Sequence, residues 1–104
     1  MPDFDEFQRG ASERLPWLPP DLLHRLCRAY GTALDEMVGS AATIDDLGWH
    51  FGAGLYEAEV RYLIRSEFAR TAEDILWRRT KLGLRMSALE QQDLADWMKD
   101  HGPS

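Results

Sequence analysis

Apolar residues recur along this chain at spacings of three and four, which is the period of a helix that buries one face. The opening segment 3–14 places Phe4, Phe7 and Ala11 at these spacings. Asp3 is a candidate cap for this segment, since its carboxylate can accept from the free amides of the first turn. The pattern predicts an N-terminal helix.

The next segment, LPWLPP at 15–20, is a linker, because a residue that precedes proline is pushed away from helical angles. A helix is then predicted to begin at Pro20, whose missing amide suits the first helical position. Gly31 supplies a left-handed stop, so this helix should cover 20–30. Its apolar stripe consists of Leu22, Leu23, Leu26, Cys27 and Tyr30.

A second short helix is predicted from Thr32, a candidate cap with Asp35 three residues later, to a stop at Gly39. The following stretch, 40–55, is rich in glycine and other helix-breaking residues. We expect an ordered loop there instead of a strand. Four apolar side chains would hold this loop: Ile44, Leu47, Trp49 and Phe51.

A third helix is predicted to start near Tyr56, with Glu57 and Arg61 forming an ion pair on its outer face. Its apolar stripe consists of Val60, Leu63, Ile64 and Phe68. These positions all recur at helical spacing, so we expect the four side chains to face the core.

Two further helices follow from cap signals. Thr71 and Asp74 have the spacing of a capping box, which predicts a fourth helix that runs through Arg79. Ser87 and Glu90 repeat this spacing before the last helix. That helix carries Leu94, Trp97 and Met98 and is expected to stop at Gly102 and Pro103.

No segment shows the two-residue alternation that is typical of a strand. The chain has 104 residues, of which 44% are apolar, so we expect one domain with a packed core. The predicted fold class is all-α, a compact orthogonal bundle of five or six short helices.

Charge and cysteine content exclude several functions. The net charge is -6, which disfavours binding to nucleic acid because phosphates would be repelled over most of the surface. Cys27 is the single cysteine, so no internal disulfide can form and a reducing cytosol fits best. No apolar run approaches the roughly 20 residues of a membrane span, and the acidic start differs from a signal peptide.

His24 and Cys27 lie three residues apart and would supply half of a zinc site. His50 and His101 are the only other soft ligands, so we favour a buried thiol beside a surface imidazole over metal binding. A catalytic dyad is less favoured still, because no third group or oxyanion hole is evident. We predict no catalytic, cofactor-binding or metal-binding residue in this chain.

The segment LLHRLCRAYGTALDEMVG, residues 22–39, imitates a DNA-binding helix-turn-helix. Its second helix would present Asp35 and Glu36 to the phosphates, which would repel them. A helical hairpin of the core is therefore the favoured interpretation.

Basic residues concentrate near the C-terminal third of this acidic chain, interleaved with Trp77, Leu82 and Leu84. They are Arg78, Arg79, Lys81 and Arg85. Such a cluster would suit an anionic lipid surface, a phosphate or an acidic face of another domain.

Internal ion pairing is the favoured interpretation of the same cluster. Asp74 lies four residues before Arg78, which is the spacing of a helical ion pair. Glu67 or Glu73 would accept a guanidinium from Arg70 or Arg79. Because Arg79 shares the stripe of residues 72, 75 and 76, we expect it at the edge of the core and paired there.

Two stretches, LPPDLLHRLCRAYGTALDEMVG and FGAGLYEAEVRYLIRSEFARTAEDILWRRTKLGL, resemble the C-terminal helical domain of FAD-dependent, quinone-linked glycerol-3-phosphate dehydrogenases. The similarity spans about residues 15–97. Its most specific parts are RLCRAYG, AEVRYL and ARTAEDILWRRTKLGL, which occur in the family's order. The matching positions in the last part and just before it are Glu67, Arg70, Thr71, Asp74, Leu76, Arg78 and Arg79. Tyr56 departs from the family, which commonly has a small hydroxyl residue there, so the cap of that helix should be weaker.

The resemblance implies that residues 1–14 are a linker or N-terminal helix leading from a flavin domain, and that 15–104 are the C-terminal helical domain. Met1 would then correspond to an internal position. The whole enzyme would oxidise sn-glycerol 3-phosphate to dihydroxyacetone phosphate and pass electrons through FAD to membrane quinone. FAD and the catalytic residues would belong to the preceding flavin and substrate domains, which are the implied partners. The implied location is the cytoplasm, with the parent enzyme peripheral at the inner face of the membrane.

These expectations give this chain a structural, interdomain or partner-docking role, with LPWLPP and RRTKLGLR as candidate docking surfaces. The alternative is a free-standing helical interaction module or DNA-binding regulator.

Overall fold

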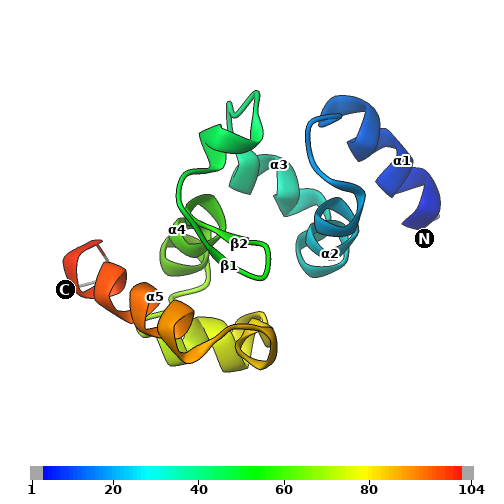
Figure 1. The fold of residues 1–104 in the computed structure, drawn as a ribbon. Coiled ribbons are helices and arrows are strands. Elements are labelled where there is room, and N and C mark those ends of the chain that lie inside the picture. The colour runs from blue at the N-terminus through cyan, green and yellow to red at the C-terminus, as the bar shows by residue number, and fades with distance from the viewer. Residues whose placement is uncertain (1–3, 102–104) are drawn as a thin grey trace. The chain divides into compact units, whose positions relative to one another are not determined.

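The computed structural model describes residues 4–101, whose helices and strands are drawn in Figure 1. The chain divides into two compact units, and the division falls between Leu47 and Gly48. The caps and stops predicted at Asp3, Gly102 and Pro103, and the side chain of Phe4, lie outside the described part. Each unit is built mainly of helices, so the predicted helical fold class is confirmed. The division into two units was not predicted.

The first unit consists of α1 (Phe4–Arg14), α2 (Pro20–Tyr30), the 3-10 turn η1 (Gly31–Ala33), α3 (Leu34–Val38) and the 3-10 turn η2 (Ile44–Leu47). Helix α2 has the predicted bounds, with Pro20 in its first turn and Gly31 at its end. The linker between α1 and α2 is anchored by Leu15 and Leu18, which are both buried. The core of this unit contains Ala11, Leu23, Leu26, Cys27, Leu34, Met37, Val38 and Leu47.

The cap predicted at Thr32 is wrong. Residues from Gly31 to Ala33 form a 3-10 turn, and α3 follows without a side-chain cap. The Asp35 carboxylate instead lies 3.3 Å from the guanidinium of Arg14 on α1. The side chain of Asp35, which the local pattern assigned to the helix cap, therefore forms an ion pair with another helix instead.

The second unit consists of β1 (His50–Gly52), β2 (Leu55–Tyr56), α4 (Glu57–Ser66), the π-helix η3 (Asp74–Arg79), the 3-10 turn η4 (Leu82–Arg85) and α5 (Ala88–His101). Its core contains Phe51, Leu55, Val60, Tyr62, Leu63, Ala69, Ile75, Leu76, Leu82, Met86, Leu94 and Met98. Phe51 and Trp97 meet edge to face at 5.6 Å, and this contact joins the hairpin to α5.

The prediction of a loop without strands over 40–55 is wrong, because β1 and β2 form an antiparallel hairpin. Gly52, Ala53 and Gly54 all have positive φ and make its tight turn. Strands of three and two residues are too short to show an alternating pattern in the sequence. Phe51 is buried as expected, whereas Trp49 is exposed.

The predicted helix over 71–79 is present in altered form. After one short α-turn, its main part is a π-helix, in which the Thr80 amide donates to the Ile75 carbonyl, five residues back. The stretch between Ser66 and Thr71 does break the helix, as the cap signal at Thr71 predicted. Phe68 lies in this connection and is exposed.

Candidate functional site

Thr71 and Asp74 form the capping box predicted from the sequence. One Asp74 carboxylate oxygen accepts from the amides of Arg70 at 3.1 Å and Thr71 at 3.2 Å, while the Thr71 hydroxyl accepts from the Asp74 amide at 3.1 Å. The Arg70 amide is the main reason that the pKa of Asp74 lies below its ordinary value, with the Thr71 amide adding to the effect. The box therefore stabilises the start of η3 and keeps Asp74 ionised.

Arg78 has the partner that its spacing predicts. Its guanidinium lies 3.9 Å from Asp74, four residues earlier, and its side chain is 81% exposed. An ion pair this long and this exposed contributes little to stability. Much of the positive charge of Arg78 therefore remains accessible to another molecule.

Arg79 does not occupy the edge of the core, and that prediction is wrong. The residue is exposed, and its guanidinium donates to the main-chain carbonyl of Glu67 at 3.1 Å instead of to a carboxylate. The physical reason is the π-helix, whose wider turn moves Arg79 off the stripe that Ile75 and Leu76 bury. No ion pair of Glu73 occurs among the described residues.

Phe68 was expected in the core and is instead 81% exposed. The Ala69 amide reaches back to the Leu63 carbonyl at 3.0 Å, across the end of α4. This closure leaves Phe68 in the left-handed conformation, with φ +59°, at a position where helices usually carry glycine. A helical pattern alone cannot show this, because it does not reveal where the helix ends.

A cavity of about 390 Å³ opens beside Phe68. It is lined by Phe68, Ala69, Asp74, Arg78 and Arg79. We call this place the Phe68 site. It combines an exposed aromatic ring with two guanidinium groups, and it contains three of the six residues that the sequence singled out as ion-pair candidates.

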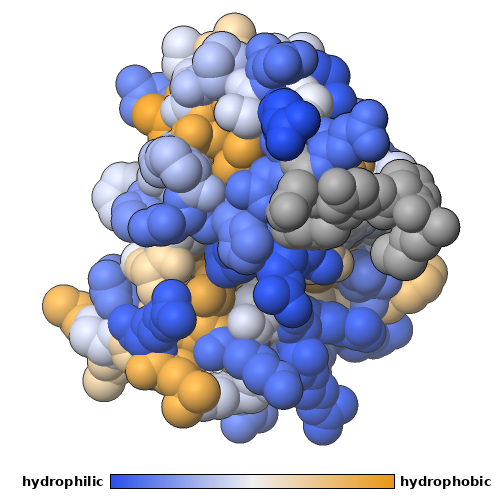
Figure 2. Space-filling model, turned by 90° about the vertical axis from the view of Figure 1, so that its right-hand side faces the viewer, coloured by the Kyte–Doolittle hydropathy of each residue, from blue (hydrophilic) through white to orange (hydrophobic). Residues whose placement is uncertain are grey.

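The predicted basic cluster lies next to this site and is exposed at all four of its positions, Arg78, Arg79, Lys81 and Arg85. Trp77 packs its indole ring against Gly83, where a Cβ would lie 2.6 Å from the ring. Leu84, between the basic residues, is exposed, whereas Leu82 is buried. On the face drawn in Figure 2, hydrophobic side chains form separate patches among hydrophilic ones.

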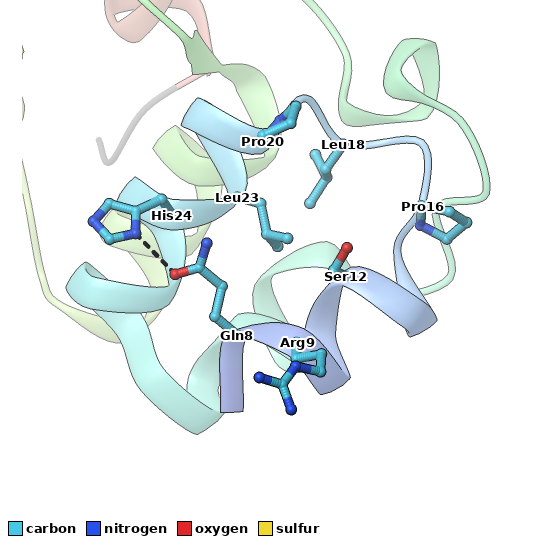
Figure 3. A pocket seen from close by; sticks show the side chains of 8 residues that line it. All are labelled: Gln8, Arg9, Ser12, Pro16, Leu18, Pro20, Leu23 and His24. Carbon is cyan, nitrogen blue, oxygen red and sulfur yellow. Dashed lines mark hydrogen bonds between the residues drawn. The ribbon is translucent and has the colours of Figure 1, made fainter. Parts of the chain in front are cut away.

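The His24–Cys27 pair has no metal-binding geometry. Cys27 is buried, and this burial raises the pKa of its thiol. His24 points toward Gln8, and the His24 Nδ1 and Gln8 Oε1 atoms are 2.8 Å apart at the rim of a cavity of about 490 Å³ between α1 and α2 (Figure 3). Within residues 4–101, no three His, Cys, Asp or Glu side chains gather as metal ligands would.

The segment that imitates a helix-turn-helix lacks a recognition helix. Helix α3 has five residues, and Leu34, Met37 and Val38 face the core. Asp35 and Glu36 are exposed and negative, so the free face of this helix would repel phosphates. The helical hairpin of the core that the sequence favoured is thus the observed structure.

The residues present do not fit a dinucleotide cofactor. Gly52 and Gly54 lie in an antiparallel hairpin instead of between a parallel strand and a helix. The space in front of Gly52 is filled by the Glu90 carboxylate. Helix α4, which follows the hairpin, begins with Glu57 and Glu59, whose charges would oppose a pyrophosphate.

In the part of the chain that the structure describes, the longest helix, α5, has 14 residues, and none of the helices combines the length and apolarity that crossing a bilayer demands.

The fold and the Phe68 site together define a mostly helical domain that carries an exposed aromatic and basic segment and no cofactor loop in its described residues. The family model for the C-terminal domain of alpha-glycerophosphate oxidase matches residues 5–101. The chain belongs to this family, so the resemblance found in its two motif-bearing stretches is confirmed.

Three relatives show how much of a longer protein such a domain represents. The chain is 41% identical to D-erythritol 1-phosphate dehydrogenase of Brucella abortus over 91% of its own length and 19% of the relative's. It is 37% identical to aerobic glycerol-3-phosphate dehydrogenase of Escherichia coli over 95% of its own length and 20% of the relative's. It is 42% identical to glycerol-3-phosphate dehydrogenase of Pseudomonas aeruginosa over 99% and 20%. The chain thus spans about a fifth of the length of these relatives.

Proposed function

We propose that this chain is the C-terminal helical domain of an FAD-dependent glycerol-3-phosphate dehydrogenase. The parent enzyme oxidises sn-glycerol 3-phosphate to dihydroxyacetone phosphate, with FAD as the hydride acceptor and quinone as the final acceptor. The observation that carries the proposal is the family match over residues 5–101 together with two relatives named as glycerol-3-phosphate dehydrogenases.

In this proposal the chain contributes no group to the oxidation itself. FAD, the general base and the groups that bind the substrate phosphate belong to the preceding flavin and substrate domains. Two features support this division: the hairpin glycines lie in an antiparallel turn where Glu90 fills the space before Gly52, and the acidic start of α4 would repel a pyrophosphate. The domain then acts as a structural partner of those domains.

The names of the relatives give two candidate substrates. The relative named for D-erythritol 1-phosphate and one named for glycerol 3-phosphate are similar to this chain to nearly the same degree, 41% and 42%. Both names describe a phosphorylated polyol. We assign glycerol 3-phosphate because two of the three relatives compared carry that name.

The parent enzyme is proposed to act in the cytoplasm and to associate peripherally with the inner face of the membrane. The reason is chemical: a quinone acceptor resides in the bilayer, whereas a phosphorylated polyol is dissolved in water. The exposed basic residues Lys81 and Arg85 are compatible with such a surface.

The test compares the whole gene product that contains this sequence with the 104-residue chain. The whole product should purify with flavin absorbance and reduce a quinone analogue when glycerol 3-phosphate is added. The 104-residue chain should do neither, even with added FAD. Turnover by the 104-residue chain would contradict the proposal, and a clear preference of the whole product for D-erythritol 1-phosphate would replace the assigned substrate.

A further inference from the structure

Phe68 combines two unfavourable features in one residue. Its backbone has φ +59°, a left-handed conformation that is unfavourable for a bulky side chain and that glycine adopts without strain. Its ring is 81% exposed, so no burial within the domain offsets this cost. Residues that hold an aromatic ring away from their own core in a strained backbone are typical of sites that contact another molecule.

Two arginines line the Phe68 site together with this residue. Arg78 reaches toward Asp74 over 3.9 Å, and Arg79 is held by the Glu67 carbonyl at 3.1 Å. The contact of Arg79 is to a neutral carbonyl, so its charge is not neutralised there. A guanidinium is suited to bind a carboxylate through two parallel hydrogen bonds.

The one acidic group of the site is already engaged. One oxygen of Asp74 accepts from the Arg70 and Thr71 amides, which holds the carboxylate toward the start of η3. The site therefore carries two guanidinium groups against a single carboxylate, whose other oxygen lies 3.9 Å from Arg78. In a chain of net charge -6 this local excess of positive charge is unusual.

We propose that the Phe68 site receives a carboxylate-bearing segment of the part of the parent polypeptide that lies outside this chain. Phe68 packs against apolar atoms of that segment, while Arg78 and Arg79 bind its carboxylate. This inference rests on the proposed function, in which the chain is one domain of a longer enzyme. The relatives are about five times as long as this chain, so such a partner has ample length to come from.

Two other occupants fit the site less well. A lipid bilayer is broad and flat, whereas the cavity of about 390 Å³ has the size of a side chain and its neighbours. A second copy of the chain would bring another net charge of -6, which opposes close approach outside the site itself. A segment of the same polypeptide is also present at a high effective concentration.

Hydroxyl-radical footprinting tests the proposal directly, because it reports the solvent access of single side chains. The measurement compares the 104-residue chain with the whole gene product. We expect Phe68 to react at least about fivefold more slowly in the whole product, since the centre of a docked interface loses nearly all contact with solvent. Leu89, which is 73% exposed on α5, is the internal control and should react similarly in both proteins.

Charge reversal identifies the role of the arginines. Arg78→Glu in the whole product should return the reactivity of Phe68 toward that in the 104-residue chain. The matched control is Arg28→Glu on α2, which also reverses an exposed arginine and should leave the protection of Phe68 unchanged. Arg78→Gln is the second variant, because it removes the charge without placing a new carboxylate beside Asp74.

Flavin absorbance and dehydrogenase activity are measured on the same preparation of the whole product. An active flavoenzyme in which Phe68 stays fully reactive would overturn this inference and leave the proposed function standing. Protection of Phe68 in a whole product without dehydrogenase activity would support the docking site and contradict the proposed function. Protection that requires anionic vesicles, or that appears in the 104-residue chain only at high concentration, would replace the proposed occupant by a membrane or a second copy.

Discussion

The carboxylate of Glu90 on α5 lies directly against the backbone of Gly52 in the hairpin. A Cβ on Gly52 would sit 2.5 Å from this carboxylate, closer than any real Cβ contact. The same carboxylate accepts from the Ser87 amide at 2.8 Å, and the Ser87 hydroxyl accepts from the Glu90 amide at 3.1 Å. The Glu90 side chain therefore both caps α5 and packs against the backbone of β1.

Gly52→Ala should destabilise the chain by about 1–3 kcal/mol, because it strains the backbone at φ +139° and displaces the cap of α5. Gly39→Ala is the matched control. Gly39 also has positive φ, but its Cβ would point into open space, so only the strain remains. Urea unfolding of the two variants measures the difference, and equal losses would show that the Glu90 contact has no energetic effect.

Thr71→Ala should lower the free energy of unfolding by about 1 kcal/mol, because the hydroxyl caps the Asp74 amide. The control is Thr32→Ala, which occurs in the same local pattern, Thr-Ala-x-Asp. Thr32 makes no cap in the structure, so its loss should stay within about 0.5 kcal/mol. Thermal or urea unfolding of both variants is the measurement, and a larger loss at Thr32 would contradict the structure.

Arg79→Ala should cost about 0.5–1 kcal/mol, which is the net value of one hydrogen bond at the surface. A buried and paired arginine, as the sequence pattern predicted, would cost several times more. Arg85→Ala is the control, since Arg85 is exposed and its side chain forms no hydrogen bond or ion pair with any residue between 4 and 101. Losses measured by urea unfolding that exceed about 3 kcal/mol for Arg79→Ala would place this side chain in the core.

The Glu57–Arg61 ion pair, predicted from its spacing, should make stability depend on pH. The Arg61 guanidinium, 2.7 Å from Glu57, holds the pKa of this carboxyl below its ordinary value of 4.5. Since the folded-state pKa is lowered, the contribution is present above pH 4.5 and is lost as the pH falls through the lowered pKa.

Glu57→Gln removes this contribution. The free energy of unfolding of this variant should be a few tenths of a kcal/mol below that of the original chain at neutral pH. The difference should shrink in acid. Urea unfolding across the pH range from neutral to acid checks this, and a constant difference would mean that the loss arises from packing and not from charge.

Local signals in the sequence were sufficient where a side chain acts on its own helix. The bounds of α2, the capping boxes at Thr71 and Ser87 and the ion pair of Glu57 all depend on residues within one or two turns. Such interactions are fixed by spacing, and spacing is visible in the sequence. The family, too, was evident from short motifs in their order.

Thr32 and Thr71 show where local signals stop being sufficient. Both begin the same four-residue pattern, yet Asp35 turns to Arg14 on another helix while Asp74 stays with its own turn. Only the fold decides this, because it places a guanidinium within reach of one carboxylate.

The same reason explains the Phe68 site. By itself the sequence determined that the chain is helical, acidic and a member of this family, since periodicity, charge and motif order are properties of the chain. Tertiary structure alone decided where α4 ends, that η3 winds as a π-helix and that Phe68 and Arg79 therefore face outward. A helical stripe shows whether a side chain faces the core or the solvent only as far as the helix keeps the same number of residues per turn.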